Sequence, residues 1–210
     1  MRRGEGVLRV GLTGGIASGK SEALRAFEAA GAEAISLDDI SHEVSRKGGP
    51  AYRSVVRAFG RSILGPDGEI DRRRLGARVF RDAAARRRLE AATHPVILRR
   101  MRALLAACRR PVAVVDAPLL FEAGLETDFD VTVLVSAGKE LQLRRLMRRD
   151  GFSRCEALAR VRAQLPTARK ERKADVVVPN ARGRGELRRR VREYQKAFEL
   201  IAHYARTRSK

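Results

Sequence analysis

The sequence predicts an α/β protein with a five-stranded parallel sheet flanked by helices. Three observations predict it: short apolar runs, helical segments that alternate with them, and glycines or carboxylates directly after several runs. Continuous apolar runs are typical of parallel strands that are buried on both faces. Because parallel strands need crossover connections, the alternating order favours one sheet covered by helices. Sheets of this kind bind ligands at the carboxyl ends of their strands.

The first half of the chain contains two apolar runs and a long helical stretch. Its predicted elements are, in order, a strand at residues 7–13, a helix at 21–30, a strand at 32–37 and a helical insertion at about 40–110. The insertion is rich in arginine and is broken by turn signals at residues 48–50 and 65–68. It contains no convincing strand, so we interpret it as a mostly helical insertion that could cover a substrate.

The second half returns to the alternation of strands and helices. Its predicted elements are, in order, strands at residues 111–116 and 130–135, helices at 139–149 and 153–168, a strand at 175–178 and a closing helix at 186–204. The run that ends in Asp116 is the clearest buried strand, since four apolar residues in succession precede the carboxylate. The closing helix carries apolar residues along one face, which predicts that it packs on the sheet.

Length and composition predict one domain over residues 1–210 in a reducing, cytoplasmic setting. The chain is 44% hydrophobic, which excludes a disordered chain of low hydrophobicity. No apolar run approaches the ~18 residues of a membrane span, and residues 1–6 lack the apolar stretch of a signal peptide. Cys108 and Cys155 are far apart in sequence and indicate neither a disulfide framework nor a metal site.

The net charge of +20 is the most unusual property of the composition. Such a chain attracts polyanions, which include nucleic acids, anionic membranes and phosphorylated small molecules. However, only seven of its 45 basic residues are lysines, and an arginine bias can reflect composition rather than function. The chain has no Trp and only 5% aromatic residues, which disfavours nucleic acid as a partner. A monomer or a weak homo-oligomer is expected.

Residues 14–21 match the phosphate-loop pattern G-x-x-x-x-G-K-[ST] in full, between a predicted strand and a predicted helix. Glycines let the backbone wrap around a phosphate, and the helix N-terminus adds its dipole. Lys20 can reach the β- and γ-phosphates, and the Ser21 hydroxyl can bind Mg²⁺. The predicted nucleotide-binding residues here are Gly14, Gly15, Ile16, Ala17, Ser18, Gly19, Lys20, Ser21 and Glu22.

Two carboxylates follow predicted strands, where this kind of sheet places its site. Asp116 could hold Mg²⁺, directly or through water, or it could be an ordinary turn or capping residue. Asp38 could face the γ-phosphate from the acceptor side, where a kinase needs a base or an orienting acceptor on the attacking hydroxyl. The alternative is a helix N-cap for the segment near Ile40, a role that fits Asp39 better.

The helix that ends at Asp150 is a further candidate site element, since it carries four arginines before a glycine break. Arg145 and Arg149 share one face at i,i+4 spacing. Small kinases with a phosphate loop use a helical lid here, whose arginines neutralise charge that develops during transfer. The alternative is a solvated basic face. Besides kinases, an NTPase stimulated by RNA or DNA fits the phosphate loop and the basic surface.

Several short segments resemble the dephospho-CoA kinase family in order and spacing. They are the opening residues 10–21, the Gly68-Glu69-Ile70-Asp71-Arg72 segment with Leu75 and Phe80, Thr93-His94-Pro95, Asp116-Ala117-Pro118-Leu119-Leu120-Phe121-Glu122, Gln142 with Arg145-Leu146 and Arg149-Asp150, Gln164-Leu165-Pro166, and Ala174-Asp175-Val176-Val177 with Asn180. Each motif alone is weak, but together they are specific and cover most of the chain.

The resemblance implies a P-loop kinase fold with three parts: a core at 7–39, 111–140 and 172–206, a helical substrate-binding insertion at about 40–110, and a helical lid at about 141–171. It implies phosphorylation of the ribose 3′-hydroxyl of dephospho-CoA with ATP and Mg²⁺, the last step of coenzyme A synthesis. Implied roles are catalysis by Asp38, Lys20 and Arg149, nucleotide binding by the phosphate loop, Arg145 and Asn180, substrate binding by Asp38, Arg72, His94 and Leu119, and metal binding by Ser21 and Asp116.

Two positions depart from the family pattern. Ser36 stands where the family usually has the first aspartate of an Asp-x-Asp motif, and Ala17 replaces a usual glycine of the loop. Ala17 is expected to be tolerated if its φ is negative. Two implied roles also have alternatives: His94 could cap or pack at a helix start before a proline, and Asn180 could form a turn. The runner-up function is another P-loop kinase, with a nucleoside or nucleotide as acceptor.

Overall fold

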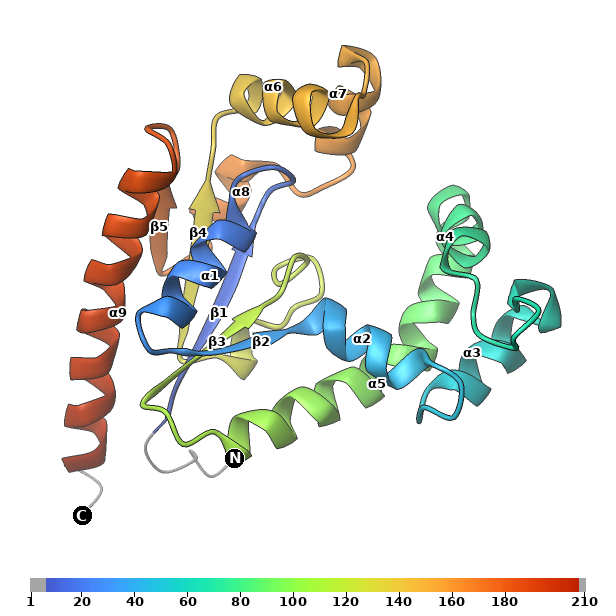
Figure 1. Ribbon diagram of the computed structural model, residues 1–210, viewed down its shortest axis with the longest axis horizontal. Helices are drawn as coiled ribbons and strands as arrows, with labels where there is room; N and C mark the ends of the chain where they lie inside the picture. The colour runs from blue at the N-terminus through green and yellow to red at the C-terminus, as the bar shows by residue number, and fades with distance from the viewer. Residues whose placement is uncertain (1–6, 208–210) are drawn as a thin grey trace. The chain divides into compact units, whose positions relative to one another are not determined.

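A computed structural model of the chain describes residues 7–207, without the side chains of residues 80 and 81. Residues 1–6, for which no signal peptide is expected, and the Phe80 side chain therefore lie outside the described part. The chain divides into two compact units (Figure 1). Unit 1 comprises Met1–Ile35 and Ala107–Lys210, and unit 2 comprises Ser36–Ala106.

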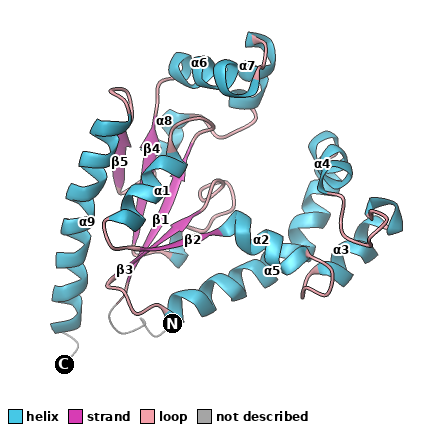
Figure 2. Cartoon of the chain, in the orientation of Figure 1, coloured by secondary structure: helices cyan, strands magenta, loops and turns pink. Residues whose placement is uncertain are grey.

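The sheet has five strands, the number that the apolar runs predict, and their order is β2-β3-β1-β4-β5. The strands are β1 (Leu8–Gly14), β2 (Glu33–Ser36), β3 (Val112–Asp116), β4 (Val131–Ser136) and β5 (Val176–Pro179) (Figure 2). β1 pairs in parallel with β3 and β4, and β4 pairs in parallel with β5. Leu12 of β1 lies opposite Asp116 of β3, so the end of β3 lies beside the start of the phosphate loop.

Two helices cover one face of the sheet, α1 (Lys20–Ala29) and α9 (Arg184–Thr207). Phe27 of α1 and Phe198 of α9 are stacked 6.2 Å apart, and both belong to the core formed with the valines of β3, β4 and β5. A Cβ atom at Gly11 would lie 2.6 Å from Leu120 and from Phe129. Glycine at this point of β1 therefore lets the loop after β3 pack closely against the strand.

The predicted lid segment contains three helices, α6 (Lys139–Asp150), α7 (Arg154–Arg162) and α8 (Thr167–Glu171). The single helix predicted over residues 153–168 is wrong, because the chain breaks before Pro166, which precedes α8. A proline restricts the residue before it to extended backbone, so the helix ends before it. A capping box formed by Ser153 and Glu156 starts α7.

Unit 2 is helical, with α2 (Leu37–Ser45), α3 (Tyr52–Phe59), a 3₁₀ turn η1 (Arg61–Ile63), α4 (Arg72–Arg81) and α5 (Ala83–Ala107). A second 3₁₀ turn, η2 (Glu126–Asp128), lies in unit 1. Within the described residues of unit 2, extended pairing is confined to one antiparallel bridge between Leu64 and Ile70, which closes the turn predicted at 65–68. Its own core includes Val55, Phe59, Ile63, Leu75 and Ala85.

Two predictions about helix starts are wrong. Asp38 and Asp39 lie inside the first turn of α2, and Ser36 is the N-cap, whose hydroxyl accepts a hydrogen bond from Asp39 N at 3.1 Å. His94 lies within the 25-residue helix α5 rather than at a helix start. Pro95 is accommodated inside that helix, although it leaves one carbonyl of the preceding turn without its usual donor.

In the described part of the chain, no helix is both long enough and apolar enough to cross a membrane. Cys108 and Cys155 are free thiols, in agreement with their spacing in the sequence.

Candidate functional site

The phosphate loop connects β1 to α1, and it contains two residues with a positive φ, Gly19 and Ala17. The loop tightens at its start, where Ser18 N donates to Gly15 O at 3.0 Å. Gly19 is the N-cap of α1 and has a φ of 101°, a left-handed value that favours glycine. The first turn of α1, which begins at Lys20, has no side-chain cap, and the first N–H groups of a helix have no acceptor in the preceding turn. An anion at this point meets both those donors and the helix dipole.

Lys20 and Asp116 form an ion pair at this end of the sheet. Their side chains are only 14% and 10% exposed, so the pair is largely removed from water. The hydroxyl of Thr13, at the end of β1, donates to Pro118 O at 3.3 Å and ties the chain after Asp116 to the loop's first strand. The structure thus brings together the lysine that was predicted to bind phosphate and the carboxylate that was predicted to bind metal.

The oxygen donors near the loop fit Mg²⁺ in kind but do not form a complete site by themselves. Ser21 offers an exposed hydroxyl and Asp116 a carboxylate, and Mg²⁺ takes oxygen ligands. Among the described residues, no three His, Cys, Asp or Glu side chains gather into a group that could hold a metal ion. This agrees with the usual binding of Mg²⁺ by one or two protein groups together with substrate phosphates and water.

Ala17 lies at the apex of the loop with a φ of 56°, so the negative φ under which alanine was expected to be tolerated is not what the structure has. In the described residues it is the one non-glycine residue with a positive φ. A left-handed alanine costs roughly 1–2 kcal/mol. Ala17 and Ile16 pack against a buried cluster of the lid helices, formed by Leu143, Leu146 and Ala157. This packing holds the apex in a conformation that alanine disfavours.

Arg145 binds the backbone of the loop. Its Nη1 donates to Ala17 O and Ser18 O, each at 3.1 Å, and its Nη2 donates to Asn180 O at 3.1 Å. Burial lowers the pKa of this guanidinium, with a smaller contribution from the nearby charge of Arg148. The side chain predicted to contact the nucleotide is therefore engaged with three carbonyls beside the nucleotide's expected place. Direct nucleotide binding by Arg145 stays a prediction.

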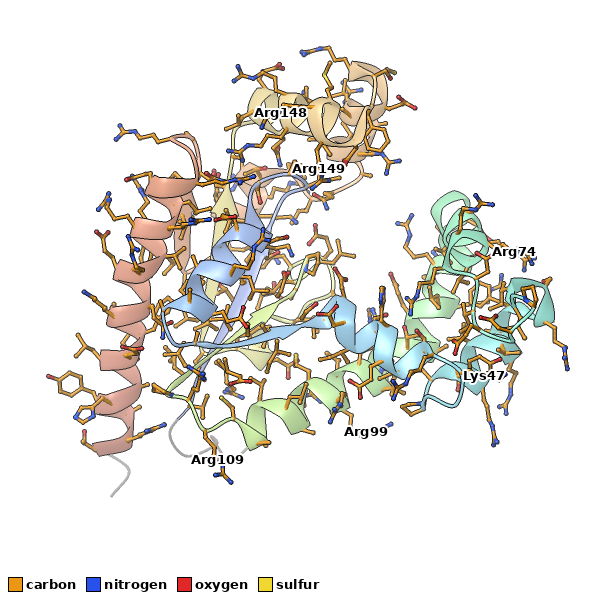
Figure 3. All side chains as sticks on the ribbon, in the orientation of Figure 1. Lys47, Arg74, Arg99, Arg109, Arg148 and Arg149 are labelled. Atoms are coloured by element: carbon orange, nitrogen blue, oxygen red, sulfur yellow. The ribbon has the colours of Figure 1, made fainter. Side chains whose placement is uncertain are left out.

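Arg149, the predicted catalytic arginine, projects from the same helix (Figure 3). It forms two hydrogen bonds with Asp150, at 2.8 and 2.9 Å, while its side chain remains 64% exposed. The hydrogen bond to Asp150 raises the pKa of the guanidinium above its already high usual value. An exposed pair of this kind is weak. Arg149 can therefore exchange its neighbour for a phosphate at little cost.

Asn180 and Glu22 were both predicted to bind the nucleotide, and both contact protein groups beside the loop. Asn180 is 5% exposed, and its amide donates to Ser18 O at 2.7 Å. A Cβ atom at Gly19 would lie 2.1 Å from that amide, which is a second reason for glycine there. Glu22 accepts a hydrogen bond from Arg188 at 2.6 Å, and this bond lowers the pKa of Glu22.

The predicted residues of unit 2 are exposed on its helices. Asp38 has its carboxylate at the surface of α2, and Arg72 begins α4. Arg72 Nη2 lies 3.4 Å from both His42 O and Ser45 Oγ, so it contacts the helix that carries Asp38. His94 is exposed on α5. Leu119, in the loop of unit 1 after β3, is an exposed apolar side chain, 48% accessible.

Four residues in and around the predicted lid segment were not predicted as site residues. Gln142 and Gln164 bind the backbone of Ile16, and Glu122 pairs with Lys170. Three of them lie in segments that resemble the family, but the sequence gives them no chemistry that points to a role. Lys170 is completely buried in a helix of five residues, and no local pattern indicates burial of a lysine there.

Known proteins match this fold and this sequence. The family model described as dephospho-CoA kinase matches residues 8–186. A dephospho-CoA kinase of Anaeromyxobacter dehalogenans is 49% identical over 175 residues, which are 82% of this chain and 83% of that protein. A dephospho-CoA kinase of Geobacter sulfurreducens is 48% identical over 187 residues, 88% of this chain and 95% of that protein.

A solved structure agrees with these sequence matches. The dephospho-CoA kinase from Campylobacter jejuni has a TM-score of 0.61 and 25% identity, and the match covers 90% of this chain and 96% of that one. The family model spans the phosphate loop, the Lys20–Asp116 pair and the lid helices that hold the loop. With a match over most of its length and the predicted phosphate loop in place, the chain belongs to the dephospho-CoA kinase family.

Proposed function

We propose that this protein transfers the γ-phosphoryl group of ATP to the ribose 3′-hydroxyl of dephospho-CoA, which gives coenzyme A and ADP in the last step of coenzyme A synthesis. One observation carries the proposal. The phosphate loop and the Lys20–Asp116 pair stand at one end of the sheet, on a chain that belongs to the dephospho-CoA kinase family. A cytoplasmic setting agrees with this activity.

The Lys20–Asp116 pair suggests how the charges of the site are stabilised before the nucleotide binds. Two opposite charges that are removed from water stabilise each other, so neither is left unpaired before ATP binds. When the β- and γ-phosphates arrive, Lys20 exchanges a carboxylate for phosphate oxygens, and Asp116 is released. Ser21 and Asp116 would then hold Mg²⁺, which supplies positive charge between the phosphates.

Asp38 is assigned to the acceptor. It lies in the first turn of α2, where its side chain is exposed. An ionised carboxylate can accept a hydrogen bond from the attacking hydroxyl and orient it, or remove its proton. Arg72, which contacts α2, and the exposed Leu119 are assigned to substrate binding together with His94.

The test of the function is ADP release from ATP with and without dephospho-CoA, in the presence of Mg²⁺. We expect strong stimulation by dephospho-CoA. Stimulation by a nucleoside or nucleoside monophosphate instead would replace the substrate assignment, and stimulation by RNA or DNA would indicate a different class of NTPase.

The test of the site uses Asp38→Asn, with Asp39→Asn as its matched control on the next residue of the same turn. Asp38→Asn is expected to lower kcat about 100-fold or more, the scale of general-base catalysis, with little change in ATP affinity. Asp39→Asn should leave kcat nearly unchanged. Equal losses in both variants would remove Asp38 from the acceptor role.

A further inference from the structure

Both backbone polar groups of Ile16, at the apex of the phosphate loop, are held by glutamine side chains. Gln142 Nε2 donates to Ile16 O at 2.9 Å, and Ile16 N donates to Gln164 Oε1 at 2.7 Å. Gln142 lies on α6, where the chain enters the lid, and Gln164 lies between α7 and α8, where it leaves. The two stems of the lid, the segments at Gln142 and at Gln164, therefore each supply one glutamine that forms a hydrogen bond with Ile16.

The direction of the two hydrogen bonds is fixed by the backbone. An N–H group can only donate and a carbonyl can only accept, so Gln164 must present its oxygen and Gln142 its NH₂ group. Gln142 is 3% exposed, and a lost partner there would leave a buried polar group unpaired. A Cβ atom at Gly15 would lie 2.4 Å from Gln142 Nε2, so glycine at this position gives the amide its access.

The segment that presents Gln164 is itself anchored next to the sheet. Leu165 N donates to Glu122 Oε1 at 3.2 Å, and Lys170 Nζ lies 2.7 Å from the same oxygen. Glu122 belongs to the loop after β3, six residues beyond Asp116. The carboxylate thus fixes the residues on both sides of Pro166, and with them the Gln164 oxygen.

We propose that Gln142 and Gln164 are positioning residues for phosphoryl transfer. They join the apex of the phosphate loop to the two stems of the lid, so that the loop amides are already aligned when phosphate binds. Neither side chain needs to touch the substrate. When the loop is already held in its binding conformation, less binding free energy is lost to ordering it. Both ATP affinity and the rate of transfer are therefore higher.

The test exploits the opposite polarity of the two contacts, with Gln164→Glu and Gln142→Glu as a matched pair. Each variant adds one negative charge beside Ile16 and keeps nearly the same shape. The carboxylate at 164 still accepts from Ile16 N, whereas the carboxylate at 142 faces a carbonyl without a proton to donate. We expect Gln164→Glu to stay within about threefold of wild type, and Gln142→Glu to lose about 10- to 100-fold in affinity for a non-hydrolysable ATP analogue.

The same affinity is measured for Gln142→Met and Gln164→Met, which carry no added charge and keep the side-chain length. Both should weaken binding of the ATP analogue about tenfold, the scale of one lost hydrogen bond at a partly buried position. Gln195→Met is the control for loss of a buried glutamine, because Gln195 Nε2 donates within its own helix α9, to Glu199 Oε1 at 2.9 Å. Its affinity should not change. Melting curves for all variants report whether each is folded.

Equal losses in Gln164→Glu and Gln142→Glu would overturn the proposal, since they would indicate an effect of charge alone. Unchanged affinity in both Met variants would overturn it as well. The proposal concerns the loop of the enzyme assigned above, but analogue binding needs no acceptor. If wild type binds the analogue but releases no ADP with dephospho-CoA, the proposed function fails while the positioning role is still decided by the affinities.

Discussion

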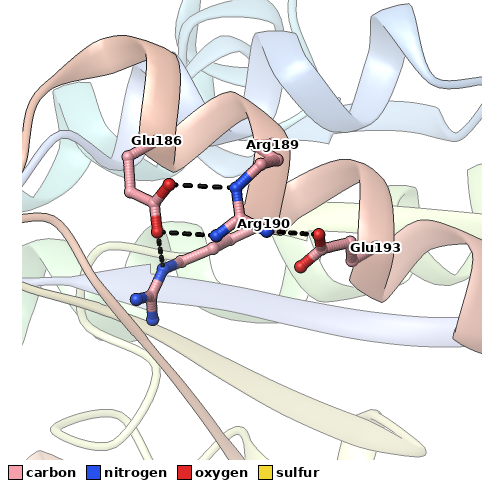
Figure 4. A network of polar contacts seen from close by, with 4 residues as sticks. All are labelled: Glu186, Arg189, Arg190 and Glu193. Atoms are coloured by element: carbon pink, nitrogen blue, oxygen red, sulfur yellow. Dashed lines mark hydrogen bonds and ion pairs between the residues drawn. The ribbon is translucent and has the colours of Figure 1, made fainter.

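Two ionic groups in unit 1 differ in number of contacts and in exposure. On α9, Glu186 and Glu193 bind Arg189 and Arg190 through distances of 2.5 to 3.0 Å (Figure 4). At the lid exit, one lysine faces one carboxylate: Lys170 is fully buried, and its Nζ lies 2.7 Å from Glu122 Oε1. The larger group stands at the surface, whereas in the smaller one the lysine is fully buried and the Glu122 side chain is 22% exposed.

The difference in exposure indicates which ionic group contributes more to the stability of the fold. Arg189 and Glu193 are 54% and 60% exposed, so water can replace each of their contacts. The Glu186 side chain is 22% exposed and pairs with Arg189 and Arg190, which are 54% and 32% exposed. Lys170, by contrast, is fully buried, so water has little access to its ammonium group, although the Glu122 side chain is itself 22% exposed. Desolvation, rather than the number of contacts, makes the single pair the stronger constraint on the fold.

The largest effect is expected from Glu122→Gln, which removes the charge and keeps an oxygen that can accept from Leu165 N. The ammonium of Lys170 is then buried without a counter-charge. We expect a loss of about 3 kcal/mol in the free energy of unfolding, or roughly 10 °C in melting temperature. Denaturant and thermal unfolding measure it. A loss below about 1 kcal/mol would mean that the burial of Lys170 is not maintained in solution.

The double variant Glu122→Gln/Lys170→Met sharpens the same contrast. Removing both charges leaves neither one uncompensated, and Met fills most of the space of the lysine. The double variant should recover at least half of the stability that Glu122→Gln loses, as a double-mutant cycle would measure. Losses that simply add would show that the two residues do not stabilise each other.

A smaller effect is expected at Ala17, where strain and packing oppose each other. Ala17→Gly removes roughly 1 kcal/mol of left-handed strain. It also loses a methyl contact with the lid cluster, about 0.8 kcal/mol, and adds about 0.4–1 kcal/mol of chain entropy to the unfolded state. These changes nearly cancel, so the free energy of unfolding should fall by less than about 1 kcal/mol. A loss above about 2 kcal/mol would assign the methyl group a larger part in holding the loop.

The smallest effect is expected on α9. The hydrogen bonds from Arg189 and Arg190 lower the pKa of Glu186 to about 2, below its usual value of 4.5. A carboxylate whose pKa is lowered by folding stabilises the folded state above the unfolded pKa, and this contribution is lost as pH falls from about 4.5 to 2. The melting temperatures of wild type and Glu186→Gln should differ only slightly at pH 6 and low salt, and converge near pH 2.

Added salt at pH 6 should also remove that difference, because an exposed network is screened. Glu140→Gln is the control, since Glu140 pairs with Arg154 on the exposed side of the lid. A salt-resistant difference at Glu186 larger than the effect of Glu122→Gln would reverse the comparison between the two ionic groups.

The strands, the phosphate loop and the end of β3 could be predicted because their signals are local. A run such as Val112 to Val115 predicts a buried strand by itself, and residues 14–21 match one pattern without a gap. The helix starts were harder to predict. Ser36 caps α2 although Asp38 and Asp39 are both good capping residues, because the exact end of β2 decides which residue stands at the cap.

Many of the arginines that give the chain its positive charge are exposed on helices. The arginines at 73, 74, 86, 87 and 88 are exposed on their helices, and Arg74 and Arg99 are seen on different helices in Figure 3. That these arginines reflect composition rather than function stays a prediction. Lys20 and Arg145 lie at the loop, and they are the cations on which phosphate chemistry is proposed to depend together with Arg149.

The sequence by itself determined the parallel sheet, the phosphate loop and the residue types that phosphate chemistry requires, because each depends on neighbours within a few positions. Only the tertiary structure decided which side chains hold that loop. Gln142 and Gln164 lie 126 and 148 positions from Ile16, and the buried Lys170 meets a carboxylate in the loop after β3. Such contacts arise when distant segments pack, and no local periodicity predicts them.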